Sequence, residues 1–266
     1  MKLIMYMILG LIQGFTETIP VSSSGHLIIF NSLLNVDALK DLNFEIFVNF
    51  GSFIAIAFFY RKEIINIIKD FFSYIKTKDK KYHTNYKYAW FIVIGTIPAG
   101  IAGLLLKDTI ESISITKVVG VCLLITALLL FLVRNIRGTK EKENMTVIDA
   151  LVVGLFQIIG LFPGISRSGS TLVGGMTRDL SRSTAFNFSF MLYLPISIAS
   201  MILGVKDVIE NPISTSLILP YILGMIVAAI FTYISIKWFK KIIEKGKLIY
   251  FVIYCLLAGL ITILFI

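Results

Sequence analysis

Long uncharged runs alternate with short charged stretches along this chain. A bilayer core of about 30 Å needs roughly 20 helical residues at ~1.5 Å per residue, so a run of nearly that length is a candidate membrane span. The apolar residues are continuous and do not alternate with period two, which favours helices over a β-barrel. The pattern predicts an all-α integral membrane protein with about six transmembrane helices. The predicted spans cover approximately residues 46–60, 88–106, 118–133, 184–204, 216–236 and 248–266.

Composition supports the same class. The 266 residues are 57% hydrophobic and only 15% charged, and the mean hydropathy is +0.87, which is far more apolar than a soluble domain requires. The net charge of +9 does not indicate nucleic-acid binding, because the basic residues gather in short loops between the predicted helices. Cys122 and Cys255 lie inside apolar runs, and we interpret them as small core residues.

The loops differ in their content of Lys and Arg, which predicts the orientation. Loops 61–87, 134–146 and 237–247 carry eight, four and five of these residues. Segment 34–45 has only Lys40, and the loops 107–117 and 205–215 carry two and one. Since cytoplasmic loops are enriched in Lys and Arg, the first three are predicted to be cytoplasmic and the others external.

Two segments resemble each other at a constant offset of 144 residues. Residues 10–26 read GLIQGFTETIPVSSSGH, and residues 154–170 read GLFQIIGLFPGISRSGS. Each is an apolar helix that stops at a proline and continues into a turn rich in Ser and Gly. The loop orientation requires residues 1–34 and residues 147–183 each to return to the side on which they enter.

We therefore predict two re-entrant helix–turn–helix hairpins in an inverted-topology repeat, an arrangement that places buried sites where the repeats meet. Repeat 1 would cover about residues 1–133 and repeat 2 about 147–266, within a single membrane domain of residues 1–266. The alternative is that residues 1–34 form two ordinary short helices.

The first segment combines metal-binding and anion-binding residue types. Gln13 and Glu17 lie one helical turn apart on one face, and their side-chain oxygens suit a hard divalent cation. Ser22, Ser23, Ser24 and Gly25 precede an apolar helix, so their amides and hydroxyls could form an anion-binding nest or simply cap the helix.

His26 follows this turn directly. Beside an anion site, a histidine could transfer a proton or act as a nucleophile. The alternative is an ordinary packed histidine.

The second turn, residues 163–171, presents Arg167 among small polar residues. A guanidinium can hold phosphate oxygens bidentately and stabilise charge during phosphoryl transfer. A charge inside a membrane costs at least ~2.5–3.5 kcal/mol, so Glu17 and Arg167 each need a partner or a function. One alternative is that they pair with each other and only hold the fold. The accompanying candidates for phosphate binding are Gly164, Ser166, Ser168 and Thr171.

These motifs resemble the undecaprenyl-diphosphate phosphatase family, the bacitracin-resistance type of integral membrane phosphatase. The first motif stands here as Gln13-Gly-Phe-Thr-Glu17 followed by Pro20-Val-Ser-Ser-Ser-Gly-His26, and the second, Pro-Gly-x-Ser-Arg-Ser-x-x-Thr, is complete at residues 163–171. The resemblance covers essentially the whole chain. Gln13 stands where many relatives carry a second glutamate.

The resemblance implies hydrolysis of undecaprenyl diphosphate to the monophosphate carrier lipid and phosphate, which recycles the carrier for peptidoglycan synthesis and confers bacitracin resistance. It implies a divalent cation, Mg or Ca, bound by Glu17 and Gln13. Ser23 and His26 are implied as nucleophile and acid/base, with the order open, and Arg167 as the phosphate clamp.

The expected location is the bacterial plasma membrane, with the active site open to the outer face. The expected partners are the polyprenyl diphosphate lipid and the bilayer, with no nucleic acid, and a homodimer is a candidate assembly. A lipid-carrier flippase or anion transporter stays open as an alternative, because inverted repeats with broken helices are also built into secondary transporters. His26 beside Glu17 favours the enzyme, since anion transport requires neither a proton shuttle nor a metal.

Overall fold

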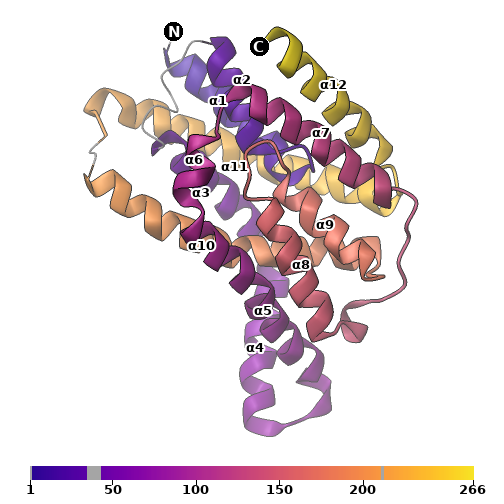
Figure 1. Cartoon of the computed structure of the whole chain (residues 1–266). Helices are drawn as coiled ribbons and strands as arrows, with labels where there is room; N and C mark the ends of the chain where they lie inside the picture. Colours follow the sequence, from indigo (N-terminus) through magenta and orange to yellow (C-terminus); the bar gives the residue numbers. More distant parts are fainter. Residues whose placement is uncertain (1, 35–42, 211–212) are drawn as a thin grey trace.

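The computed structural model describes residues 2–34, 43–210 and 213–266, so most of the predicted external segment 34–45, with Lys40, lies outside the described residues. In the described part of the chain the structure is helical, and the β structure there is one isolated bridge between Lys140 and Leu180. The all-α prediction is confirmed (Figure 1). The helices are α1 Lys2–Thr18, α2 Ser23–Leu34, α3 Asn43–Phe59, α4 Arg61–Thr77, α5 His83–Leu105, α6 Lys107–Ser112, α7 Thr116–Val133, α8 Val147–Ile159, α9 Arg167–Thr177, α10 Arg182–Glu210, α11 Thr215–Glu244 and α12 Ile249–Phe265.

Four helices among the described residues are long and apolar enough to cross a membrane, namely α5, α7, α10 and α11. Helices α3 and α4 pass the same test only as a pair, bent by 68° at their junction, and would make a fifth span. Helix α12 is apolar but has 17 residues. Each predicted span lies in a helix, apart from at most one residue at either end, and the number of six crossings stays a prediction.

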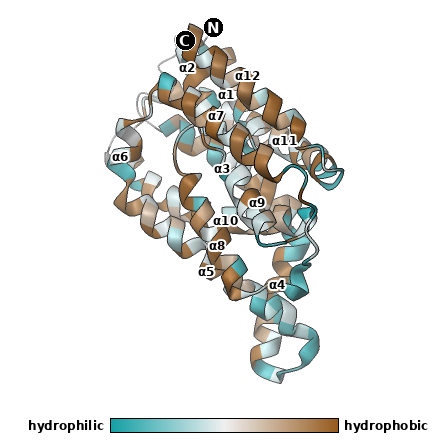
Figure 2. Ribbon diagram, turned by 45° about the vertical axis from the view of Figure 1, so that its right-hand side comes forward, coloured by the Kyte–Doolittle hydropathy of each residue, from teal (hydrophilic) through white to brown (hydrophobic). Residues whose placement is uncertain are grey.

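The outward-facing sides of the long helices are apolar. On α11, exposed isoleucines recur every four residues, from Ile218 through Ile226 to Ile234. On α5, Trp90, Val93 and Ile97 are exposed at helical spacing. In water such stripes would be unfavourable, whereas in lipid they face a solvent as apolar as themselves. Figure 2 shows hydrophobic colours over most of the bundle and hydrophilic colours where α4 turns back toward α5.

Glycine contacts hold the helices together in pairs. A Cβ added at Gly10 of α1 would collide with the backbone of Gly224 in α11, and one at Gly154 of α8 would collide with Gly95 in α5. Small residues let membrane helices approach closely, so that van der Waals packing can stabilise them. Gly10 and Gly154 are also corresponding positions of the two similar segments. The inverted repeat and its orientation in a membrane stay predictions.

The two Ser/Gly-rich turns meet. Ser22 and Gly164 both have positive φ, 69° and 92°, which reverses the chain sharply at each turn. The amide of Gly164 donates a hydrogen bond to Ser22 Oγ at 3.1 Å, and Gly25 packs on the backbone of Gly164. Thr126 of α7 braces the second turn, because its Oγ1 donates to the Gly164 carbonyl and accepts from the Ser166 amide, both at 3.1 Å.

Candidate active site

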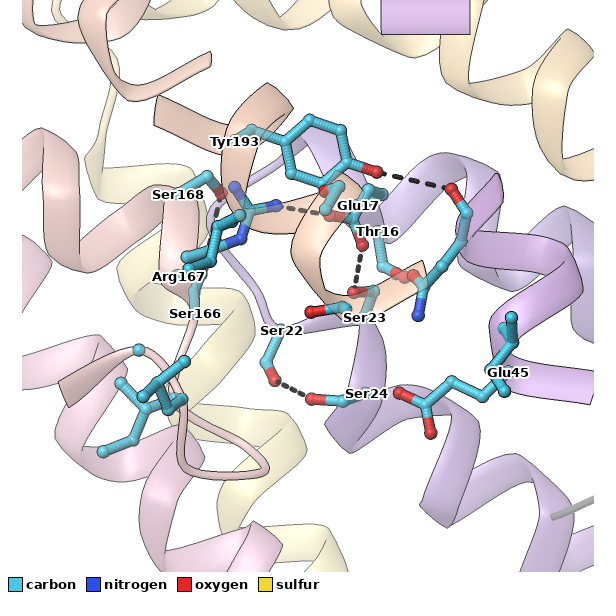
Figure 3. Close-up of a pocket in the computed structure, with 18 of the residues that line it drawn as sticks. Thr16, Glu17, Ser22, Ser23, Ser24, Glu45, Ser166, Arg167, Ser168 and Tyr193 are labelled. Carbon is cyan, nitrogen blue, oxygen red and sulfur yellow. Dashed lines mark hydrogen bonds and ion pairs between the residues drawn. The ribbon is translucent and has the colours of Figure 1, made fainter. Parts of the chain in front are cut away.

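Glu17 lies at the point where the two turns converge. Its Oε1 forms an ion pair with Arg167 Nη2 at 2.5 Å, and its Oε2 accepts from Ser23 Oγ at 2.5 Å and from Gln13 Nε2 at 2.9 Å. The glutamate side chain is only 6% exposed, so these donors replace the water that a carboxylate otherwise requires. Glu17 thus links a hydroxyl from the first motif to the guanidinium of the second (Figure 3).

The first turn places its three serines along the pocket wall, where Ser22, Ser23 and Ser24 all line the pocket. Ser22 is the most buried, at 4%, and its Oγ accepts from the Gly25 amide at 3.3 Å, as a helix-capping hydroxyl does. Ser23 opens α2 and directs its hydroxyl to Glu17. Ser22 therefore has the capping role foreseen as the alternative, whereas Ser23 is turned toward the candidate chemistry.

The second turn supplies Arg167 at the first position of α9. Ser166 caps this helix by accepting from the Gly169 amide at 3.0 Å. The Arg167 guanidinium carbon lies 4.1 Å from the centre of the Tyr193 ring. The cation is therefore held between a carboxylate and an aromatic face, and its side chain keeps 16% exposure toward the pocket. Ser166 and Ser168 line the same pocket.

The pocket is a cavity of about 240 Å³. Its polar wall comes from the two turns and from Glu45 and Asn49 of α3, while Ile46, Ile196 and Met201 form an apolar side. A volume of this size is below the 300–1,000 Å³ typical of pockets that enclose a whole drug-sized ligand. It suits a small polar head group whose apolar remainder lies elsewhere.

His26 points away from this pocket. Its Nδ1 lies 2.7 Å from the Ser22 carbonyl, and its Nε2 lies 2.6 Å from the hydroxyl of Tyr254 on α12. Because a carbonyl only accepts, Nδ1 carries the proton and Nε2 of the neutral ring accepts from tyrosine. His26 is 3% exposed and is not among the residues that line the pocket. The structure therefore does not bring His26 to Ser23, although only two residues lie between them in sequence.

Four further predicted residues lie beside the pocket without lining it. Gln13 is 1% exposed and presents its amide nitrogen, not its oxygen, to Glu17. Thr171 is fully buried, and its hydroxyl lies 2.5 Å from that of Ser189. Gly25 and Gly164 form the contact between the two turns. These residues support the pocket-lining residues and are not themselves part of the pocket wall.

Sequence reasoning missed Glu45, Asn49 and Tyr193, which all line the pocket. In Figure 3 the Glu45 carboxylate points into the pocket beside Ser24. Glu45 and Asn49 lie one turn apart on α3, the same spacing as Gln13 and Glu17 on α1, and that spacing at the start of an apolar run was a usable signal. Tyr193 carried no comparable signal within its apolar run.

Comparison with known proteins identifies the family. Residues 6–261 match the family described as "Bacitracin resistance protein BacA". The chain is 43% identical over 261 residues to "Undecaprenyl-diphosphatase 2" of Bacillus thuringiensis (strain Al Hakam), covering 98% of this chain and 96% of that protein. It is 42% identical over 265 residues to "Undecaprenyl-diphosphatase 1" of Bacillus licheniformis, covering 99% and 98%. It is 41% identical over 263 residues to "Undecaprenyl-diphosphatase" of Oceanobacillus iheyensis, covering 98% and 95%.

The match spans nearly the whole of each protein and includes both turns of the candidate site. The chain therefore belongs to the family of the bacitracin resistance protein BacA.

Proposed function

We propose that this protein hydrolyses undecaprenyl diphosphate to undecaprenyl phosphate and inorganic phosphate. The observation that carries the proposal is the Ser23–Glu17–Arg167 chain of contacts, with a hydroxyl and a guanidinium on one carboxylate. The family and the printed names of its members support the substrate. The small polar cavity fits a diphosphate head group, while the polyprenyl chain stays among the lipids. Undecaprenyl phosphate would then re-enter peptidoglycan synthesis, and this hydrolysis is the proposed basis of the resistance for which the family is named.

Arg167 holds the terminal phosphate in this proposal. Its guanidinium offers parallel N–H donors to phosphate oxygens and stabilises the negative charge that phosphoryl transfer redistributes. Phosphate oxygens would compete with Glu17 for the same N–H groups. Substrate binding would thereby release Glu17 Oε1 from its ion pair while leaving Oε2 on Ser23.

Ser23 is the proposed nucleophile, and Glu17 is the proposed base. Ser23 Oγ attacks the terminal phosphorus as its proton passes to Glu17 Oε2, 2.5 Å away. The bond between that phosphorus and the bridging oxygen breaks, and undecaprenyl phosphate leaves with the bridging oxygen. Glu17 passes this proton to solvent and is a carboxylate again. Water then attacks the phosphorus of the phosphoserine as its proton passes to Glu17. The bond between this phosphorus and Ser23 Oγ breaks, Ser23 Oγ recovers a proton from Glu17, and inorganic phosphate departs.

His26 has a different place in this scheme from the one the sequence suggested. Its ring pins the Ser22 carbonyl, directly before Ser23, at a residue whose φ is 69°. Left-handed backbone of this kind is costly for a residue other than glycine and persists only when its surroundings enforce it. His26 therefore fixes the direction of the Ser23 side chain and has no contact through which to accept the Ser23 proton.

A divalent cation, Mg or Ca, is part of the proposal, and the donor set fits one. Glu17, Glu45 and Asn49 are hard oxygen ligands lining one pocket. Glu45 takes part in none of the ion pairs between described residues, and its carboxylate faces the pocket. No group of three or more His, Cys, Asp or Glu that could hold a metal ion occurs in the described chain, so substrate oxygens and water would complete the coordination. When bound, the cation neutralises diphosphate charge.

The metal-binding role predicted for Gln13 rests on its Oε1, which is buried and has no hydrogen-bond partner in the described part of the chain. Its Nε2 is engaged by Glu17 and by Asn49 Oδ1, the latter at 2.7 Å. Through the second of these bonds Gln13 also joins α1 to α3, and Glu45 is the second carboxylate of the proposed cation site.

The test is phosphate release from undecaprenyl diphosphate by purified protein in detergent. Ser23→Ala and Glu17→Gln should each lower the rate by roughly 10²–10⁴, the usual worth of a positioned base or its nucleophile. Because the two act as a unit, the double variant should be no slower than the worse single variant. Exposed Ser216→Ala and Glu143→Gln are matched controls. Absence of phosphate release by the unmodified protein, or full activity of Glu17→Gln, would reject the proposal.

The expected setting is the plasma membrane of a bacterium, with the pocket open to the outer face. The loop charges support this orientation, since the basic loops 61–87, 134–146 and 237–247 would then be cytoplasmic. A homodimer remains a candidate assembly.

A further inference from the structure

Tyr193 covers one face of the candidate phosphate clamp. The residue belongs to α10 and is 3% exposed. Its ring centre lies 4.1 Å from the Arg167 guanidinium carbon, and its hydroxyl donates to the Asn49 carbonyl at 3.4 Å. Figure 3 shows the ring above the guanidinium and the hydroxyl directed to the neighbouring helix.

These contacts close a ring of interactions through four helices. Tyr193 contacts the Asn49 backbone, and the Asn49 side chain accepts from Gln13. Gln13 donates to Glu17, Glu17 pairs with Arg167, and Arg167 lies under Tyr193. The four helices are α10, α3, α1 and α9. A closed network of this kind fixes each member more firmly than separate pairs do.

We propose that Tyr193 is a positioning residue for Arg167, an inference that rests on the clamp role proposed above. A guanidinium recognises phosphate through donors in one plane, so the orientation of that plane decides whether two bonds or one can form. The Tyr193 ring fixes the plane from one face by a cation–π contact that is strong when desolvated. The donor edge is then left facing the pocket before substrate arrives, which lowers the ordering cost of binding.

The aromatic ring of Tyr193 orients the Arg167 guanidinium, and the Tyr193 hydroxyl contributes less. Tyr193→Phe keeps the aromatic face and loses one long hydrogen bond, and it should stay within about threefold of the unmodified protein. Tyr193→Leu fills much of the same space without a π face. It should weaken phosphate recognition by roughly ten- to thirtyfold, the equivalent of a buried cation–π contact.

The experiment measures affinity for inorganic diphosphate by titration calorimetry, together with kcat and KM, for Tyr193→Phe, Tyr193→Leu and Arg167→Ala. Phe190→Leu is the matched control, because Phe190 is a buried aromatic residue one turn earlier on α10 that packs against Phe186. We expect Tyr193→Leu to weaken diphosphate binding and to lower kcat/KM. Tyr193→Phe should keep both close to their values in the unmodified protein, and Phe190→Leu should change only the unfolding temperature.

A double variant separates positioning from packing. Tyr193→Leu should change diphosphate affinity no further once Arg167 is alanine. A normal affinity for Tyr193→Leu, an equal loss for Tyr193→Phe, or an undiminished loss in the Arg167→Ala background would each overturn the inference. Full diphosphate affinity of Arg167→Ala would instead reject the proposal that Arg167 binds phosphate. Weak binding by Arg167→Ala together with normal binding by Tyr193→Leu would reject only the positioning role of Tyr193.

Discussion

Replacing Arg167 by lysine distinguishes two roles of this residue: stabilising the fold through its ion pair with Glu17, and binding phosphate. The structure contains the Glu17–Arg167 pair that the sequence raised as a purely structural alternative. Lysine preserves the positive charge beside Glu17 but not the planar fork that grips two phosphate oxygens. Arg167→Lys should therefore fold normally and still fail in phosphoryl transfer.

The magnitudes follow from the burial of the pair. Removing one partner of a buried ion pair costs ~3–5 kcal/mol when the remaining charge has no other contacts. Here Ser23 and Gln13 still donate to Glu17, so Arg167→Ala should lose about 1–3 kcal/mol, the cost of an incompletely satisfied buried group. Arg167→Lys should lose about 1 kcal/mol or less. Activity should fall ~10²–10³-fold in both, as when one preorganised donor is removed.

The assay pairs phosphate release with thermal unfolding of the same preparation in detergent. Arg167→Lys should unfold near the temperature of the unmodified protein, while its kcat/KM falls close to that of Arg167→Ala. Near-normal turnover by the lysine variant would refute the clamp, because charge alone would then suffice. A lysine variant as unstable as the alanine variant would show that the fork geometry serves the fold.

Three further predictions concern His26, Glu45 and the orientation of the loops in the membrane. His26→Ala should lower kcat roughly tenfold or more, because Ser23 is then less well positioned, and Tyr254→Phe should lower kcat less and leave the pH profile unchanged. Normal activity of His26→Ala would contradict the positioning role. Glu45→Gln should weaken Mn²⁺ binding, measured by electron paramagnetic resonance, by about tenfold or more, whereas the exposed control Asp108→Asn should change it little; equal affinity for Glu45→Gln would exclude Glu45 as a ligand. A cysteine at Lys206 should react with impermeant thiol reagents in intact cells and one at Lys80 should not, against low background because Cys122 and Cys255 are buried; labelling at Lys80 would reverse the orientation.

The parts of the site that sequence could predict are those where polar residues interrupt apolar helices. Glu17 and Arg167 were conspicuous because a membrane segment carries a charge only at a cost. The serines and glycines around them form turns with positive φ at Ser22 and Gly164, and a cluster of Ser and Gly within an apolar segment can be recognised in the sequence. The contact between two turns more than 140 residues apart followed from their similarity and their loop charges. Its details, such as the Gly164 amide on Ser22, did not.

The role of His26 shows a second limit. Spacing along a helix places a side chain on a face, but it does not say which neighbouring helix covers that face. Ser23 faces α1 and meets Glu17, whereas His26 faces α12 and meets Tyr254. The tyrosine is 228 residues away in sequence, so only the packing of α12 could reveal that the imidazole is already engaged on both nitrogens.

Glu45 was missed for a reason inherent in how spans are recognised. A predicted span is an uncharged run, so its boundary is drawn at the first charged residue, and Glu45 was assigned to the loop preceding a span that began at residue 46. The helix in fact begins at Asn43, and the carboxylate belongs to its first turn, facing the pocket. Acidic residues are favourable in the first turn of a helix, which makes such positions suitable for functional carboxylates. A charge at the edge of an apolar run, paired at one helical turn with an amide such as Asn49, therefore merits the same attention as a charge inside it.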